Sequence, residues 1–212
     1  MMTAKITLFG RATSVNVQKA LWALHETKVE FEWKESESQI GWPNNPDYLK
    51  INPNGRVPSL IVGDQIIRQS NVIVRYVAYS YARGSLWPED ALVRAHSDEW
   101  MDWQQTELYQ NITPVFWGLV RTPMEKRDMK AIGEAANKLN GNFKVLEGHL
   151  AERKWKYVAG DSFTMGDIPV GAALYRYMAM PLDRPSLPNV KAYYERMLER
   201  PAFQNDIVMP LS

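Results

Sequence analysis

Asn52-Pro53-Asn54-Gly55-Arg56-Val57-Pro58-Ser59-Leu60 is the stretch that decides this fold, and Gln69-Ser70-Asn71 follows it nine residues later. Pro58 has no N–H and stands where an inward-running strand should begin, so it marks an irregular strand entry. Such an entry leaves the backbone groups of Val57 free, and a cis Val57–Pro58 bond would let them pair in antiparallel fashion with a short extended peptide. Gln69 and Ser70 then open a helix, whose unpaired N–H groups attract a carboxylate. Together these features predict a site for a small peptide-like anion.

The overall composition indicates an ordinary globular protein. The chain has 212 residues, of which 45% are apolar and 23% are charged, and this length allows one large domain or two small ones. We favour two domains. No apolar run approaches the length of a membrane span, and a net charge of +1 gives no field that would recruit nucleic acid or an anionic membrane. We therefore expect a soluble protein without nucleic-acid or membrane partners.

The chain has no cysteine, which limits both its chemistry and its expected compartment. Disulfides, thiolate metal sites and an enzyme-borne thiol nucleophile are excluded, so any thiol used here arrives with the ligand. His25, His96 and His149 lie far apart in the sequence without partners at metal-ligand spacing, and we expect no metal. Because the N-terminus lacks the pattern of a signal peptide, we expect a cytoplasmic protein.

Hydrophobic periodicity predicts a β-α-β unit and then a β-β-α unit in the first part of the chain. The predicted strands span residues 6–9, 29–33, 59–62 and 65–68, and the predicted helices run from about 17 to 28 and from 71 to 81, with at most a short helix at 46–51. Gly63-Asp64 joins the last two strands as a tight hairpin turn. This order describes a compact four-stranded mixed sheet, as in the thioredoxin-like fold.

The rest of the chain is predicted to be helical. Gly84-Ser85-Leu86-Trp87-Pro88 combines turn formers with a proline, which indicates an inter-domain linker. Helical spacing then recurs over residues 91–111, 125–152, 167–178 and 189–200. We therefore predict a thioredoxin-like α/β domain over residues 1–82, a linker over 83–90 and an all-α domain over 91–212.

Thr164-Met165-Gly166-Asp167 predicts where one of these helices begins. The pattern fits a capping box with Asp in place of Glu or Gln, in which a hydroxyl and a carboxylate satisfy N–H groups at the helix start reciprocally. We interpret Asp167 as a structural residue rather than a catalytic one, because the cap uses its lone pairs. Pro169 follows closely and removes a helix hydrogen bond unless the first turn is irregular.

With these motifs in place, the chain resembles a cytosolic glutathione transferase of the bacterial theta-like, serine-using type over nearly its full length. Residues 52–58 resemble the cis-proline loop of that family, and Gln69-Ser70-Asn71 resembles its acid-or-amide then hydroxyl pair. Residues 98–104 resemble the start of its helical domain, and residues 164–171 are similar to its capping motif. The resemblance implies a thioredoxin-like domain that binds glutathione, an all-helical domain that forms most of the electrophile pocket, and a homodimer.

Glutathione is a tripeptide with two carboxylates, one α-amino group and one thiol, so it matches the site inferred from the sequence. The residues that the resemblance implies for its binding are Trp42, Arg56, Val57, Pro58, Gln69 and Ser70. The backbone of Val57 would pair with the cysteinyl part, and Gln69 and Ser70 would hold the γ-glutamyl end. Arg56 and Trp42 lie near the positions from which family members hold the glycyl end. Many members carry Glu where Gln69 stands, so the attraction to the glutathione ammonium is expected to be weaker here.

Ser14 is the residue that we expect to activate the glutathione thiol. It follows the first strand, opens the first helix and aligns with the serine of the theta-like classes. Its hydroxyl would be a neutral hydrogen-bond donor to the sulfur, and the alternative is that it only caps the helix. Secondary candidates are the hydroxyl of Thr13, the amide of Asn16 and the charge of Arg11, although a loop arginine is more often solvated. Phe9 departs from the pattern of the tyrosine-using classes.

Aromatic residues of the helical part allow two interpretations. They would line an electrophile pocket or belong to the core, and aromatic residues at helical spacing are more often core. The residues concerned are Trp100, Trp103, Tyr109, Phe116 and Trp117. We select Tyr109 and Trp117 as pocket residues.

The sequence therefore predicts an enzyme that binds glutathione as its co-substrate, stabilises the thiolate and transfers it to small electrophiles, a detoxification function. Two alternatives stay open. The first is a glutathione-dependent disulfide reductase or peroxidase in which glutathione supplies every sulfur atom. The second is a non-catalytic binding or scaffold protein on the same fold, because fold does not establish activity.

Overall fold

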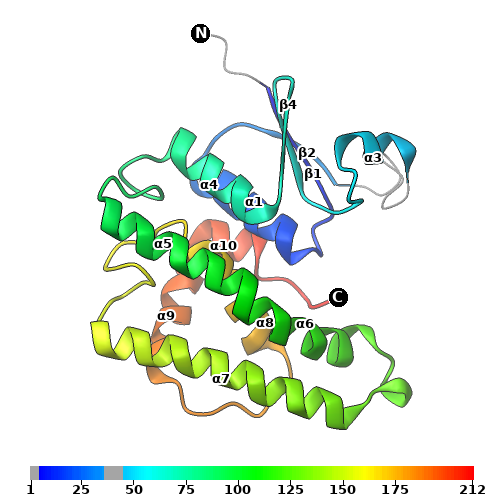
Figure 1. The fold of residues 1–212 in the computed structure, drawn as a ribbon, viewed down its shortest axis with the longest axis vertical. Helices are drawn as coiled ribbons and strands as arrows, with labels where there is room; N and C mark the ends of the chain where they lie inside the picture. Colours follow the sequence, from blue (N-terminus) through cyan, green and yellow to red (C-terminus); the bar gives the residue numbers. More distant parts are fainter. Residues whose placement is uncertain (1–4, 36–44) are drawn as a thin grey trace.

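A four-stranded mixed sheet lies beside a helical bundle in the computed structural model, which describes residues 5–35 and 45–212 (Figure 1). The strands are β1 (Ile6–Phe9), β2 (Glu32–Lys34), β3 (Ser59–Val62) and β4 (Gln65–Arg68). Their order in the sheet is β2-β1-β3-β4. β1 is parallel to β2 and antiparallel to β3, and β3 pairs with β4 as a hairpin. The predicted fold class, a thioredoxin-like domain followed by a helical domain, is confirmed.

The second strand is shorter and lies later than predicted. We expected residues 29–33, whereas β2 begins at Glu32 and ends at Lys34. Its pairing with β1 starts at the Thr7–Glu32 register, and β1 has only 4 residues. Within the described residues, the alternating pattern before Glu32 therefore pairs with no strand.

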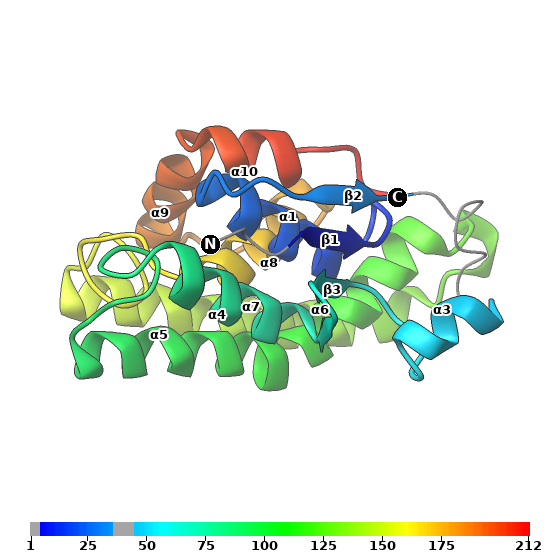
Figure 2. The same cartoon turned by 90° about the horizontal axis from the view of Figure 1, so that it is seen from above.

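Helix α1 (Val15–Glu26) joins the sheet to the helical bundle. Its helical neighbours are α4 (Ser70–Tyr81), α8 (Asp167–Ala179) and α10 (Pro201–Asp206), and Figure 2 shows α10 beside it. Trp22 of α1 is fully buried, and its ring centroid lies 4.9 Å from that of Phe203 in α10. A Cβ atom on Gly171 of α8 would lie 3.0 Å from the Trp22 ring, so glycine permits this close approach. The hydrophobic core is thus continuous between the two parts.

A long helical rod passes beneath α4 (Figure 1). It consists of α5 (Ala91–Trp103), the π-helical turn η1 (Gln104–Leu108), α6 (Tyr109–Phe116) and the π-helical turn η2 (Trp117–Arg121). The predicted helix ended near Asn111, but the rod continues to Arg121. Pro114, which removes an α-helical hydrogen bond, lies inside α6 between the two π-helical turns. The rod therefore continues with an irregular hydrogen-bond pattern instead of ending.

The remaining helices mostly follow the predicted segments. They are α3 (Pro46–Ile51), α7 (Met129–Arg153) and α9 (Pro188–Leu198), with a 3₁₀ turn η3 (Met124–Lys126) before α7. α7 starts later than the predicted residue 125 because Asp128 caps it, accepting a hydrogen bond from the N–H of Ala131 at 3.0 Å. Helix α10, which begins with Pro201, was not predicted. The assignment of residues 83–90 as a linker stays a prediction. No helix in the described part of the chain has the length and apolar character to cross a membrane.

Helix α8 begins at Asp167 as predicted, but the capping box is only half formed. The Asp167 carboxylate accepts hydrogen bonds from the Thr164 N–H at 2.7 Å and from the Thr164 hydroxyl at 3.1 Å. That hydroxyl caps no helix N–H, and it accepts instead from Ser97 at 3.0 Å. The other carboxylate oxygen accepts from the Val158 N–H and the Tyr193 hydroxyl, each at 3.0 Å. Burial raises the pKa of Asp167 to about 6, although these bonds favour the charged form.

Candidate functional site

Two adjoining cavities lie where the loop before β3, the start of α1 and the helical rod meet. The outer cavity, of about 680 Å³, is lined by Asn16, Asn52, Asn54, Arg56, Val57, Pro58, Gln69, Ser70, Gln105 and Tyr109. The inner cavity, of about 130 Å³, is lined by Arg11, Thr13, Ser14, Val15, Asn16, Gln104, Tyr109, Ile112, Thr113, Phe116, Trp117, Arg121, Ala173 and Arg176. Asn16 and Tyr109 line both cavities. The two cavities therefore adjoin, with Asn16 and Tyr109 at their boundary.

Two side chains hold the loop before β3 through the backbone of Arg56. Its Val57–Pro58 bond is cis. The Tyr48 hydroxyl donates to the carbonyl oxygen of Arg56 at 2.8 Å, and the Asn52 amide donates to the same oxygen at 2.6 Å. Among the described residues, none hydrogen-bonds to the N–H or C=O of Val57. These two groups therefore face the outer cavity as an open backbone edge for an extended peptide.

The start of α4 forms the opposite wall of the outer cavity. Gln69 has φ 72° and ψ 118°. Residues other than glycine adopt such a positive φ only at an energetic cost. Ser70 is buried, and its hydroxyl donates to the Asn16 side-chain oxygen at 3.1 Å, so α4 is tied to the first turn of α1. The first N–H groups of α4 have no intrahelical partner, so they are available to donate to a negatively charged ligand.

Ser14 lies at the N-terminus of α1 on the wall of the inner cavity. The Ser14 N–H donates to the Arg11 carbonyl at 3.2 Å, and its own carbonyl accepts from the Gln18 N–H at 2.9 Å. Its side chain makes no capping hydrogen bond to the helix. The hydroxyl is thus available to a ligand, beside the positive end of α1.

Comparisons with known proteins agree with this geometry. Residues 4–79 match the family model described as the N-terminal domain of glutathione S-transferase, and residues 108–201 match the model of its C-terminal domain. The chain is 36% identical over 209 residues to glutathione S-transferase GstB of Escherichia coli K12, covering 98% of this chain and 100% of GstB. It is 32% identical to glutathione S-transferase 3 of Zea mays, covering 96% and 94% of the two chains.

A solved structure extends the likeness to three dimensions. The theta class glutathione S-transferase of Xanthomonas axonopodis pv. citri, with glutathione bound, matches with a TM-score of 0.92 and 38% identity over 99% of this chain and 100% of that one. This chain belongs to the glutathione S-transferase family. The resemblance inferred from its motifs is confirmed, and the enzyme is a glutathione transferase.

The structure brings most of the predicted site residues of the transferase together. Ser14, Thr13 and Arg11 line the inner cavity, and Asn16 lies between the two cavities. The residues expected to bind glutathione that line the outer cavity are Arg56, Val57, Pro58, Gln69 and Ser70. Trp42 lies outside the described residues. None of the three histidines is among the residues that line either cavity.

The aromatic residues of the rod divide between cavity and core. Tyr109 lines both cavities, and Trp117 lines the inner one with 60% of its surface exposed. Trp100 is buried in the core, as the alternative interpretation expected. Phe116 is buried and also lines the inner cavity, so it belongs to both groups.

Sequence reasoning missed several polar residues of the site. Gln104 and Gln105 come from the π-helical turn η1, and Arg121 ends the π-helical turn η2. Arg176 of α8 lines the inner cavity and donates to the Thr13 carbonyl at 3.1 Å. Burial and the neighbouring Arg121 lower the pKa of Arg176 to about 10. A single cationic residue within the apolar 168–177 segment was the signal that could have found it.

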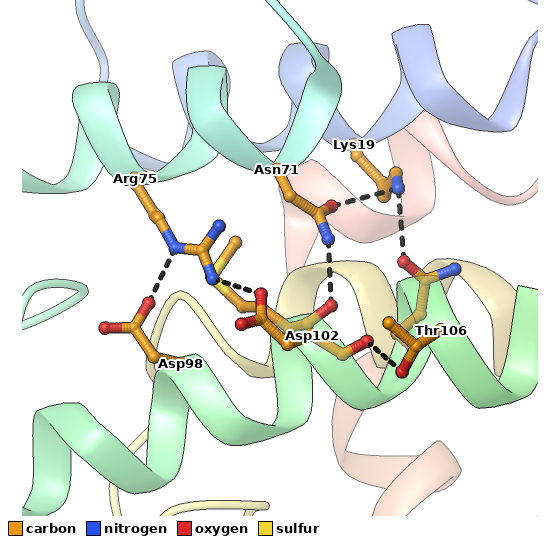
Figure 3. A network of polar contacts seen from close by, with 8 residues as sticks. Lys19, Asn71, Arg75, Asp98, Asp102 and Thr106 are labelled. Carbon is orange, nitrogen blue, oxygen red and sulfur yellow. Dashed lines mark hydrogen bonds and ion pairs between the residues drawn. The ribbon is translucent and has the colours of Figure 1, made fainter.

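A buried polar network lies behind the cavities of the transferase and links three helices (Figure 3). The Lys19 ammonium of α1 is fully buried and donates to the Asn71 side chain of α4 at 3.0 Å and to the Gln104 side chain at 3.3 Å. The Asn71 amide donates in turn to the Met101 carbonyl of α5 at 2.9 Å. Burial, and to a lesser degree the charge of Arg176, lower the pKa of Lys19 to about 7.

A second link between α4 and α5 is ionic and lies nearer to solvent. The Arg75 guanidinium of α4 donates to Asp98 at 2.6 Å and to Asp102 at 2.7 Å (Figure 3). These two carboxylates raise the pKa of Arg75 despite its partial burial. Both links hold α4, and with it the Ser70 end of the outer cavity, against the helical rod.

Proposed function

We propose that the transferase binds glutathione in the outer cavity, with the sulfur at the boundary beside Ser14, and transfers the thiolate to a small electrophile held in the inner cavity. The observation that carries this proposal is that the two cavities adjoin at Asn16 and Tyr109. The open backbone edge of Val57 suits the cysteinyl part of glutathione. The start of α4, with Gln69 and Ser70, suits the γ-glutamyl carboxylate.

Activation of the thiol is the chemical task of such a site. A free thiol with a pKa of about 8.5 is mostly protonated at neutral pH, whereas the thiolate is the nucleophile. Lowering that pKa by about two units takes about 2.7 kcal/mol of preferential stabilisation of the thiolate. The uncapped Ser14 hydroxyl would donate one hydrogen bond to the sulfur, and the N-terminus of α1 would add its positive potential. The thiol proton leaves to solvent.

Replacement of Ser14 by alanine is the test. Because a hydrogen bond to a charged acceptor is lost, we expect the Ser14→Ala variant to have kcat/KM about 10- to 100-fold lower at neutral pH. The pKa of the bound thiol should rise, so the pH–rate profile should move to higher pH. Ultraviolet absorbance of the enzyme-bound thiolate during a pH titration measures this directly.

Thr13→Val is the matched control, since it removes the neighbouring hydroxyl and leaves the backbone carbonyl that binds Arg176. We expect its thiolate titration to follow that of the wild-type enzyme. A Ser14→Ala titration identical to wild type would eliminate Ser14 as the activating residue. A shift in Thr13→Val or in Asn16→Ala, but not in Ser14→Ala, would assign the role to that neighbour.

We also propose that the transferase is a cytoplasmic homodimer that acts in detoxification and uses glutathione without a metal ion. Two exposed apolar side chains on α4 support the dimer. Val72 is 45% exposed and Tyr79 is 46% exposed, and their spacing of seven residues places them on one face of the helix. Exposed apolar side chains on one face are typical of interaction sites. The molecular mass in solution tests the dimer.

A further inference from the structure

The inner cavity carries an excess of positive charge. Among the described residues, its lining includes Arg11, Arg121 and Arg176 but no aspartate or glutamate. Two of these guanidinium groups lie around the ring of Phe116, with their central carbons 4.1 Å (Arg176) and 5.8 Å (Arg121) from its centroid. The cavity therefore places two cationic groups around one apolar surface.

Neither Arg121 nor Arg176 forms an ion pair within the described part of the chain. Arg176 is half-buried, and its side chain donates a hydrogen bond to the Thr13 carbonyl at 3.1 Å and to no other described residue. Lys19, fully buried behind the same wall, also has only amide acceptors. Arg75, by contrast, has two carboxylates. Desolvated cations such as Arg176 and Lys19 are normally paired, and Arg121 adds an exposed positive charge at the same cavity. With no carboxylate among the described lining residues, the cavity favours an anionic occupant.

The position of Arg176 relates this charge to the reacting sulfur. Its guanidinium holds the carbonyl of Thr13, which is the residue directly before Ser14. An anionic group bound to the free edge of that guanidinium would thus lie within a few atoms of the Ser14 hydroxyl. The planar guanidinium matches a carboxylate with two parallel hydrogen bonds. A volume of about 130 Å³ limits the occupant to a small group.

We propose that the electrophile of this transferase carries a carboxylate next to the carbon that is attacked, and that Arg176 and Arg121 bind this carboxylate. A short α-haloacid is the simplest member of this class. The inference rests on the proposed function, because it assumes glutathione in the outer cavity. In the reaction, the thiolate electron pair forms the new S–C bond while the carbon–halogen bond breaks and its electron pair leaves with the halide. The conjugate keeps its carboxylate in the inner cavity.

Binding of two matched conjugates tests the proposal without any turnover. S-carboxymethylglutathione and S-carbamoylmethylglutathione differ only by a carboxylate and a neutral amide, and calorimetry gives the affinity of each and of glutathione. We expect the wild-type enzyme to bind the carboxylate conjugate about 10- to 100-fold more tightly than the amide. Arg176→Gln and Arg121→Gln should each reduce this ratio. Lys138→Gln removes one exposed charge from α7 and should leave the ratio unchanged.

The outcomes separate the inference from the function on which it rests. Binding of glutathione with equal affinity for the two conjugates would overturn the inference and leave the proposed function standing. If Arg176→Gln weakens all three ligands equally and Arg121→Gln changes nothing, Arg176 only positions the Ser14 turn and the inference is wrong. If the wild-type enzyme binds none of the three ligands, both proposals fail.

Turnover gives a second, independent measurement. Chloroacetate and chloroacetamide react with glutathione by the same substitution, and released chloride reports both rates after subtraction of the spontaneous reaction. The ratio of kcat/KM between enzyme-catalysed chloroacetate and chloroacetamide should fall about 10-fold or more in Arg176→Gln. An unchanged ratio in both arginine variants would contradict the inference.

Discussion

Asp167 and Lys19 are both fully buried ionisable residues, but their surroundings differ sharply. Asp167, inside the helical domain, accepts hydrogen bonds from Val158, Tyr193 and twice from Thr164. Lys19, at the junction between α1, α4 and η1, donates only to two neutral amide oxygens. The carboxylate therefore organises its neighbours strongly, whereas the ammonium is held weakly and titrates near neutrality. The buried charge with four directed donors secures the fold, and the one with only two amide acceptors lies beside the functional site.

The largest effect is expected where the carboxylate is removed. Asp167→Ala leaves the buried N–H groups of Val158 and Thr164 without partners, so the free energy of unfolding should fall by more than about 3 kcal/mol. Urea unfolding of the variant and of Asp161→Ala, an exposed neighbour, checks this. A loss in Asp167→Ala no larger than in Asp161→Ala would contradict a stabilising role of the buried carboxylate.

A smaller effect is expected where one donor to Asp167 is removed. Tyr193→Phe deletes the buried hydroxyl that donates at 3.0 Å and should lower the free energy of unfolding by about 2 kcal/mol. Tyr194→Phe is the matched control, because no described residue forms a hydrogen bond with that hydroxyl. Equal losses in the two variants would mean that the bond to Asp167 contributes nothing specific.

The smallest effect at neutral pH is expected at Lys19. Because the variant removes a poorly compensated charge but leaves two amide oxygens unpaired, Lys19→Met should change the free energy of unfolding by about 1 kcal/mol at pH 7. The pH dependence is the sharper readout. Folding lowers the pKa of Lys19 from 10.5 to about 7. Between these two pH values the unfolded chain binds a proton that the folded chain does not. The free energy of unfolding of the wild type therefore rises with pH over this range.

Unfolding measured from pH 7 to 9 distinguishes the two enzymes. The wild type should gain up to about 1.4 kcal/mol per pH unit relative to Lys19→Met over this window. Asp167 gives the opposite sign at lower pH. Folding raises the pKa of Asp167 from 3.8 to about 6, so the protonated carboxyl stabilises the folded state below pH 3.8. This contribution is lost as the pH rises to about 6. Parallel curves for wild type and Lys19→Met above pH 7 would contradict the inferred titration of Lys19.

Local patterns predicted two walls of the outer cavity, the loop before β3 and the start of α4, but not the wall that Gln105 forms. The irregular strand entry at Pro58 and the helix start at Gln69-Ser70 can each be predicted from a few neighbouring residues. This is because proline and helix termini act through their own backbone groups. The start of α8 followed for the same reason. The hydroxyl of Thr164 was mispredicted, since Ser97, 67 residues away, competes for it.

The inner cavity could be predicted only in part. Ser14 was found from its place after β1, but Arg121 and Arg176 meet only when η2 and α8 pack together. No short-range pattern describes such convergence. The continuation of the rod past Asn111 was also missed, because Pro114 normally predicts a helix end.

The π-helical turns of the rod set the rotational phase of the residues that follow them. A π turn holds one residue more than the α-helical hydrogen-bond pattern does, and each residue of an α-helix turns the next by about 100°. Gln104 faces the inner cavity, Gln105 the outer one, and Tyr109, directly after η1, touches both. Deletion of a single residue from η1 would rotate Tyr109 and the whole of α6 relative to the two cavities. The number of residues in this turn, and not only their chemistry, therefore fixes which side chains line the two cavities.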